Sequence, residues 1–354
     1  MKKIFVLVIT FSLLISCQKK KTVADKTETF FNAVTIDTLL SESISIRAIL
    51  IDANKVWYAA NNGKYGYYDL KTQKSFSGHV SKDTLSLEFR SIAQTSKHIF
   101  IAAIGNPGLV YRISKDGSKI NLVYQEINEK VFYDSMQFWN DNEGIAMGDP
   151  TEDCLSIIIT RDGGATWKKL SCDQMPKVIF NEAAFAASNT NIIIKGDNTW
   201  LVSGGMQSRV FFSADKGNSW KVYNTPIDQG AEMKGIFTAD FYDADNGFIA
   251  GGNFEDQNKN FGNKAITKDG GKTWQLVAEK SGFGFASCVQ YVPNSNGKAL
   301  VCVGASGLQY SADTGNTWQQ LLTDKTLYTI RFQNDSTAIA AGKNKIISIK
   351  FSKK

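Results

Sequence analysis

Short stretches of alternating apolar and polar residues fill most of the chain, and clusters of Asn, Asp and Gly separate them. Residues 138–148 and 241–251 show the pattern clearly, since each has two apolar runs around an Asn/Asp-rich turn that ends in Gly. Alternation with a period of two is typical of a β-strand with one buried face, and such turns join antiparallel strands. The pattern therefore predicts an all-β chain built from hairpins.

One eight-residue motif, Ser/Thr-x-Asp-x-Gly-x-Ser/Thr-Trp, occurs four times. Its tryptophans are 53, 54 and 44 residues apart, and four of the chain's 7 Trp occupy this position. Asp accepts hydrogen bonds across a turn and Gly adopts a positive φ, so the motif predicts a tight hairpin in each repeat. We expect structural roles for its repeated residues, which are Asp162 and Trp167, Asp215 and Trp220, Asp269 and Trp274, and Asp313 and Trp318.

The repeats divide the chain into seven strand-rich units. These cover residues 45–76, 88–124, 131–171, 181–223, 233–278, 283–322 and 326–354. The last unit has room for three strands only, and residues 33–40 would supply the fourth. Ring closure by strands from both ends of the chain removes exposed edges. The sequence thus predicts a seven-bladed β-propeller with four-stranded blades over residues 34–354, closed by an N-terminal strand in the last blade.

The repeated motif resembles the Asp-box, or bacterial neuraminidase repeat, which joins the third and fourth strands of propeller blades in that family. A wider resemblance covers nearly all of the mature chain. Gly105-Asn-Pro-Gly108, Gly148-Asp-Pro150 and Tyr291-Val-Pro293 are similar to segments of bacterial propellers related to photosystem II stability/assembly factors. Members of that group are often labelled oxidoreductases, but this chain has no strand-linked Gly-x-Gly-x-x-Gly, so we expect no cofactor.

The first residues predict export. Lys2 and Lys3 precede an apolar run from Ile4 to Ile15 that is too short to span a bilayer. Leu14-Ile15-Ser16-Cys17 resembles the bacterial lipoprotein cleavage box, which implies a signal peptide over residues 1–16 and a lipid on Cys17. Residues 17–33 are then a lipidated Cys and a flexible tether, and a buried N-terminal strand is the alternative. The expected location is the cell envelope, at the periplasmic face of the outer membrane.

Charge and composition exclude several functions. The formal net charge of +6 arises partly in the signal and tether, and no stripe of Arg and Lys is interleaved with stacking aromatics, so nucleic-acid binding is not expected. With only His79 and His98, the chain offers no His/Cys metal cluster and no Ser-His-Asp arrangement. We therefore predict no metal site.

Five charged residues follow the blade period: Arg47, Arg90, Asp134, Glu182 and Lys234, at spacings of 43, 44, 48 and 52. Each should begin an inner strand, so together they would surround the mouth of the central channel, where propellers usually bind ligands. An arginine guanidinium forms bidentate hydrogen bonds with carboxylate or sulfate groups, and carboxylates accept hydrogen bonds from hydroxyls. The structural alternative is a solvent-filled channel mouth, where the five charged side chains pair with one another and hold the loops in place.

These features favour a monomeric, lipid-anchored binding or assembly scaffold, without catalysis, that presents its channel mouth to a protein or glycan. The alternative is a glycoside hydrolase, sialidase-like or otherwise active on glycans, with Asp134 and Glu182 as its two carboxylates. Against a sialidase, residues 88–92 match the Phe/Tyr-Arg-Ile-Pro opening only in part and no nucleophilic Tyr stands out. A redox enzyme is the least favoured class.

Export would permit disulfides. Cys154 and Cys172 are symmetric about Gly163, and Cys288 and Cys302 are symmetric about Ser295, so a simple hairpin would place each pair opposite one another. Because cross-strand bridges are often strained, each pair is equally compatible with a disulfide and with two buried thiols.

Overall fold

The computed structural model describes residues 31–353, so the predicted signal peptide, Cys17 and most of the tether lie outside the described residues. In this part of the chain no helix is long and apolar enough to cross a membrane. Phe31, which the tether prediction included, is buried against Tyr310 and Phe351, with ring centroids 5.4 and 5.3 Å away. The folded part therefore begins before residue 34.

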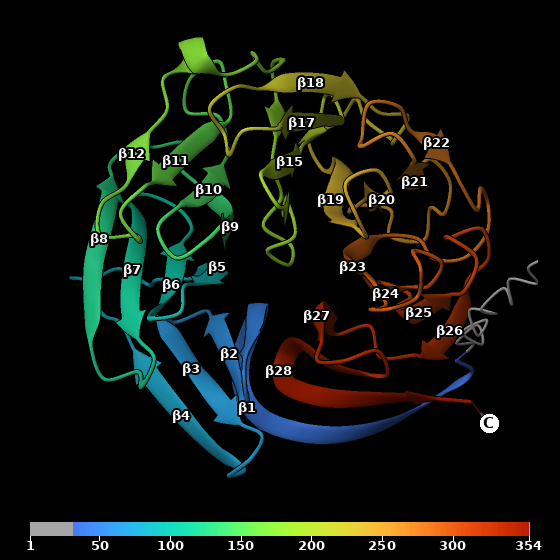
Figure 1. Ribbon diagram of the computed structural model, residues 1–354, viewed down its shortest axis with the longest axis horizontal. Coiled ribbons are helices and arrows are strands. Elements are labelled where there is room, and N and C mark those ends of the chain that lie inside the picture. The colour runs from blue at the N-terminus through green and yellow to red at the C-terminus, as the bar shows by residue number, and fades with distance from the viewer. Residues whose placement is uncertain (1–30, 354) are drawn as a thin grey trace, which may run out of the picture.

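Six β-sheets stand side by side in a ring, which is the architecture of a β-propeller (Figure 1). Four of the sheets have four strands each. They contain β5 (Phe89–Gln94), β6 (His98–Ala103), β7 (Gly108–Ser114) and β8 (Ile120–Glu126); β9 (Tyr133–Phe138), β10 (Gly144–Gly148), β11 (Ser156–Thr160) and β12 (Lys168–Lys169); β14 (Ile192–Lys195), β15 (Asn198–Val202), β17 (Arg209–Ser213) and β18 (Lys221–Asn224); and β23 (Ala286–Tyr291), β24 (Leu300–Gly304), β25 (Gly307–Ser311) and β26 (Gln319–Leu322).

The other two sheets have six strands each. In order across the sheet, one contains β27 (Leu327–Phe332), β28 (Thr337–Ser352), β1 (Ala33–Asp52), β2 (Lys55–Ala60), β3 (Lys64–Asp69) and β4 (Lys74–His79). The second contains β13 (Glu182–Ala183), β16 (Gly204–Gly205), β19 (Lys234–Phe241), β20 (Gly247–Asn253), β21 (Lys264–Thr267) and β22 (Gln275–Leu276). A short 3-10 helix, η1 (Cys172–Gln174), is the one helical element within residues 31–353.

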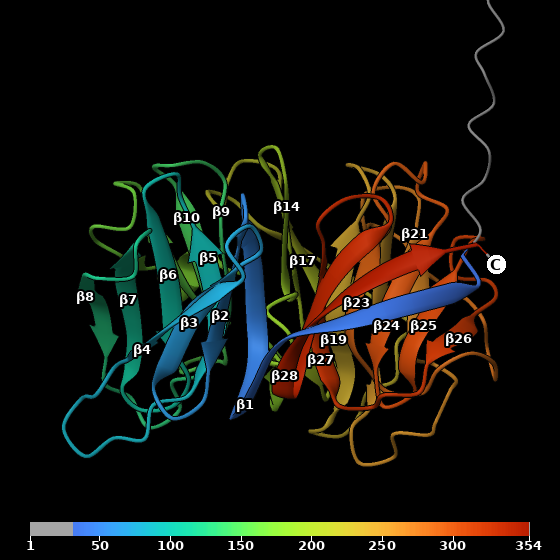
Figure 2. The same ribbon diagram turned by 90° about the horizontal axis from the view of Figure 1, so that it is seen from below.

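The prediction of seven four-stranded blades is wrong, because the chain forms six sheets. Strand β1 is continuous over 20 residues. Its first part pairs with β28, from Ala33 opposite Ser352 to Ser45 opposite Lys343, and its last part pairs with β2. The first and last predicted units therefore belong to one sheet. The expected pairing of an N-terminal strand with the C-terminal strand is present, and β1 and β28 lie side by side in both views (Figures 1 and 2).

The four repeated turns share one hydrogen-bonding pattern. In each, the Asp carboxylate accepts from the backbone N–H and the hydroxyl of the Ser or Thr four residues later, at 2.6–3.0 Å. The hydroxyl that opens the motif accepts from the Gly N–H at 2.8–2.9 Å. Every Asp of the motif is thus occupied in closing its own turn.

Apolar side chains fill the spaces between neighbouring sheets. Trp57 of β2 belongs to the same buried cluster as Phe89 of β5, and Trp200 of β15 stacks on Phe241 of β19 with ring centroids 3.9 Å apart. Full burial of a large apolar side chain stabilises the fold by about 1.5–3 kcal/mol. The core is therefore divided into separate clusters, and several of them lie between neighbouring sheets.

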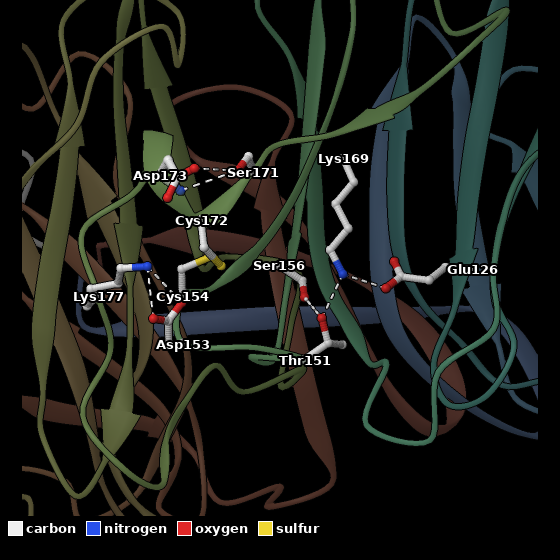
Figure 3. The surroundings of a disulfide bond; sticks show 10 residues. All are labelled: Glu126, Thr151, Asp153, Cys154, Ser156, Lys169, Ser171, Cys172, Asp173 and Lys177. Carbon is white, nitrogen blue, oxygen red and sulfur yellow. Dashed lines mark hydrogen bonds and ion pairs between the residues drawn. A yellow bond between two sulfur atoms is a disulfide. The ribbon is translucent and has the colours of Figure 1, made fainter.

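One of the two candidate disulfides is present. Cys154 and Cys172 are joined where the loop before β11 meets η1, beside the ion pair of Lys177 with Asp153 (2.9 Å; Figure 3). Cys288 and Cys302 are buried free thiols. The hairpin is centred between Ser295 and Asn296 rather than on Ser295, which places Val289, not Cys288, opposite Cys302. Since neighbouring residues of a strand point to opposite faces, the two thiols lie on different faces of their sheet.

Candidate functional site

Three of the five charged residues predicted to converge do line one cavity. Arg47, Arg90 and Asp134 lie on the wall of a space of about 530 Å³, which is in the range of small-ligand pockets. The remaining lining residues are Phe132, Asp149, Asn181, Ala183, Ala184, Phe185, Ala186, Ala187, Glu232, Met233, Phe237, Phe254 and Phe285. The regular spacing of charged residues in the sequence therefore pointed to this cavity, although it did not identify every charged residue that lines it.

Glu182 has a different environment from the one predicted. Its side chain is fully buried and accepts hydrogen bonds from Arg209 Nε (2.9 Å) and Nη2 (2.5 Å), while Ser203 Oγ donates at 2.6 Å. A carboxylate bonded in this way is a structural group rather than the partner of Asp134 in acid–base catalysis.

Lys234 also stays outside the cavity. Its Nζ lies 3.7 Å from Asp228 Oδ1, and Lys259 Nζ contacts the other oxygen of the same carboxylate at 2.6 Å. Lys234 therefore belongs to a small network of ion pairs next to the cavity. This agrees with the structural alternative, in which such charges pair with one another and hold the loops in place.

Asp149 is the cavity residue that the sequence analysis missed. It follows β10 directly, and its Oδ1 accepts a hydrogen bond from the Ala184 N–H at 2.9 Å. Burial raises the pKa of Asp149 to about 6. Burial, and then the neighbouring Asp149, raise the pKa of Asp134 well above its ordinary value, and Arg90 and the nearby N–H of Ala186 oppose the rise. The cavity thus contains a buried pair of carboxyl groups.

The two arginines already have partners. The Arg47 guanidinium lies over the Tyr328 ring, 4.4 Å from its centroid, and Nη1 is 3.4 Å from the Ala187 carbonyl oxygen. Burial, followed by the charge of Arg90, lowers the pKa of Arg47. Arg90 Nε donates to Glu88 Oε1 at 2.8 Å. These contacts hold both guanidinium groups at the cavity wall.

A group of phenylalanines forms an apolar wall of the same cavity. Phe185 and Phe237 stack in parallel with centroids 3.9 Å apart, and Phe285 meets Phe237 and Phe254 edge to face at 4.7 and 5.3 Å. Residues 31–353 contain no group of three His, Cys, Asp or Glu side chains suited to a metal ion. The site can therefore offer charge, hydrogen bonds and an aromatic surface to a ligand.

The chain itself crosses the channel beside this cavity. Residues 188–190, which we call the cross-channel segment, bond to strands from around the ring. The bonds are Asn189 Nδ2 to Ile92 O (2.8 Å), Met136 N to Asn189 Oδ1 (2.9 Å), Thr190 Oγ1 to Thr238 Oγ1 (2.8 Å), Ser188 Oγ to Ser287 O (2.6 Å) and Arg331 Nη2 to Ser188 O (3.0 Å). The segment therefore connects the inner strands β5, β9, β19, β23 and β27.

We expect the carboxyl pair to make folding less favourable as the pH rises. A pKa of about 6 in the folded state, above the usual 3.8, means that folding favours protonated Asp149. The stability that it contributes below pH 4 should be lost between pH 4 and pH 6, by about 2–3 kcal/mol. Urea unfolding of Asp149→Asn from pH 4 to pH 8 should show a smaller decline than the wild type. Asp335→Asn, an exposed control, should keep the full decline, and an Asp149→Asn variant that keeps it would contradict the assignment.

Comparisons with known proteins identify the architecture. No protein-family model matches the chain, and no curated protein does. Among solved structures, a YCF48 bound to D1 peptide matches 92% of this chain and 99% of its own, with a TM-score of 0.64 and 15% sequence identity. This chain is a β-propeller. YCF48 from Cyanidioschyzon merolae matches 89% of the propeller and 98% of itself (TM-score 0.61, 13% identity).

The propeller is also similar to structures outside the YCF48 group. The WD40 β-propeller domain of Doa1 matches 92% of this chain and 98% of its own, with a TM-score of 0.62 and 12% identity. At such low identity these likenesses show the fold alone. The YCF48 neighbours are photosystem II assembly-factor propellers, so they are consistent with the resemblance noted in the sequence.

Proposed function

We propose that this propeller is a non-catalytic binding scaffold that holds a segment of a protein partner at the mouth of its central channel. The observation that carries the proposal is the cavity of about 530 Å³, which combines two fixed guanidiniums, a carboxyl pair and an aromatic wall. Such a mixture suits a peptide, because a peptide presents amide groups and apolar side chains together. That a YCF48 propeller is known bound to D1 peptide supports a protein partner over a glycan.

The proposal includes the cell envelope as the place of action. The Lys-rich start, the short apolar run and Cys17 support export and lipid anchoring. In this proposal the propeller is a monomer held at the periplasmic face of the outer membrane, and more than one acyl chain on Cys17 would keep it there.

Site-specific photo-crosslinking in native envelopes tests the binding face. A photo-crosslinking residue replaces Phe254 at the cavity, and the matched control replaces Ile36 on β1; both residues are 40% exposed. We expect a discrete adduct from position 254, identified by mass spectrometry, at least fivefold more abundant than from position 36. Adding Arg47→Glu should reduce it, because the reversed charge removes the donor at the cavity wall. Equal adducts at both positions, or an adduct insensitive to Arg47→Glu, would reject the channel mouth as the binding face.

A further inference from the structure

The buried carboxyl group of Asp134 is not satisfied by a hydrogen-bond donor. Its side chain is fully buried on the cavity wall. The nearby Ala186 N–H makes no hydrogen bond of normal length and angle with either carboxyl oxygen, and neither oxygen has another partner in the described part of the chain. A buried carboxyl without partners is costly to the fold, and such groups in native proteins usually have a role. A bound group with several N–H donors would satisfy both oxygens.

The balance of charge favours a cation in that place. Three carboxyls, those of Asp134, Asp149 and Glu232, face the cavity, against the guanidiniums of Arg47 and Arg90. Arg90 lies near Asp134 but is also paired with Glu88, which does not line the cavity, so its charge is shared between the two carboxyls. Arg47 keeps one buried donor without a partner in residues 31–353, its Nε. A ligand that fits therefore brings a compact cation for the carboxyls and a single acceptor for Arg47.

The cross-channel segment limits the shape of the ligand. Ala187 lines the cavity, whereas Asn189, two residues later, lines a separate hollow of about 210 Å³. Because the intervening backbone is bonded to inner strands from around the ring, an extended chain cannot pass from one space into the other. A peptide that enters this cavity must end there or turn back.

We propose that the cavity receives the amino-terminal residue of a peptide chain. The α-ammonium group donates to Asp134 and Asp149, the first carbonyl oxygen accepts from Arg47 Nε, and an apolar first side chain packs on the phenylalanine wall. A carboxyl terminus fits less well, because it would leave Asp134 without a cation and add a further negative charge to the site. This inference rests on the proposed function and specifies which part of the partner is recognised.

Peptide binding to the purified full chain with its native disulfide tests the inference. The probe is the fluorescently labelled amide Phe-Ala-Gly-Ser-Lys, with the dye on the Lys side chain, and the comparison is the same peptide with an acetylated amino terminus. We expect the free amine to bind at least tenfold more tightly in fluorescence anisotropy, because acetylation removes the cation. Equal affinity, tighter binding of the acetylated form, or no binding of either peptide would overturn the proposal.

Variants separate recognition of the ammonium from a general effect on the fold. Asp134→Asn should weaken the free-amine peptide at least tenfold and leave the acetylated one unchanged, whereas Phe254→Ala should weaken both. Asp335→Asn, the exposed carboxyl control, should change neither. Circular dichroism shows whether each variant is folded, and Asp149→Asn is the second test if Asp134→Asn is not.

This experiment and the crosslinking experiment fail independently. A position-254 adduct that depends on Arg47, together with peptides that bind equally well when acetylated, would leave the channel-mouth function standing and reject recognition of the amino terminus. Selective binding of the free amine without any partner adduct in the envelope would leave amino-terminal recognition standing and reject the protein-scaffold function.

Discussion

Replacing Arg209 by Ala should lower the free energy of unfolding by about 3–5 kcal/mol, because it leaves a buried carboxylate without its counter-charge. The Glu182 side chain is 0% exposed and that of Arg209 only 10%. The guanidinium also donates to the Lys177 carbonyl oxygen at 2.7 Å, so it holds the loop between η1 and β13. Equilibrium urea unfolding followed by Trp fluorescence measures the loss.

Two companion variants test the reason for that loss. Arg161→Ala breaks an ion pair with Glu143 in which both side chains are partly exposed, and it should cost less than about 1 kcal/mol. Adding Glu182→Gln to Arg209→Ala removes the stranded charge, so the double variant should be more stable than the single one. A double variant that is less stable than Arg209→Ala would show that charge burial is not the cause.

Asn189→Ala should be the second most damaging substitution, with a loss of about 3–4 kcal/mol. The Asn189 side chain satisfies the Ile92 carbonyl and the Met136 N–H, and both would become buried polar groups without partners. Its backbone φ of 59° adds strain for Ala, since this left-handed region favours Asn and Gly. Thermal and urea unfolding, with Asn189→Gly measured in parallel, separate the two effects.

The control for this variant is Asn218→Ala, at an exposed turn, where the amide donates to the nearby Asp215 carbonyl and accepts one long bond from Arg161 (3.4 Å). That substitution should cost less than about 1 kcal/mol. If Asn189→Ala is equally mild, the cross-channel segment does not hold the inner strands together. Asn189→Gly should fall between the two, because it keeps the backbone conformation and loses only the side-chain bonds.

The sequence predicted the repeated units of the propeller well because each unit is closed by local interactions. Asp162 bonds only to residues of its own turn, so eight residues are enough to specify the structure. The number of sheets was not predictable in this way. Residues 33–52 contain no Gly or Pro to interrupt the strand, and a single strand then serves two predicted units. Whether two units share a strand depends on the path of the backbone through both.

The site was predictable where it follows the blade period and not elsewhere. Arg47, Arg90 and Asp134 occupy equivalent positions and do line one cavity. Glu182 has the right spacing, but its side chain turns to Arg209, a partner distant in the sequence. Asp149 was missed because it stands after the second strand of its sheet, a position that inner-strand spacing does not sample. The predicted pairing of Cys288 with Cys302 failed because the hairpin turn is centred half a residue beyond Ser295.

The pairing of β1 with β28 also determines when the circle can be completed during biosynthesis. Residues 33–45 find their partner only in residues 343–352, the last strand of the described chain. The ribosome must therefore translate residues 343–352 before the first part of β1 can pair. A chain that stops earlier leaves the edge of β1 unpaired, where it could pair with strands of other polypeptides. Closure of the ring of sheets thus requires that β28 has been synthesised.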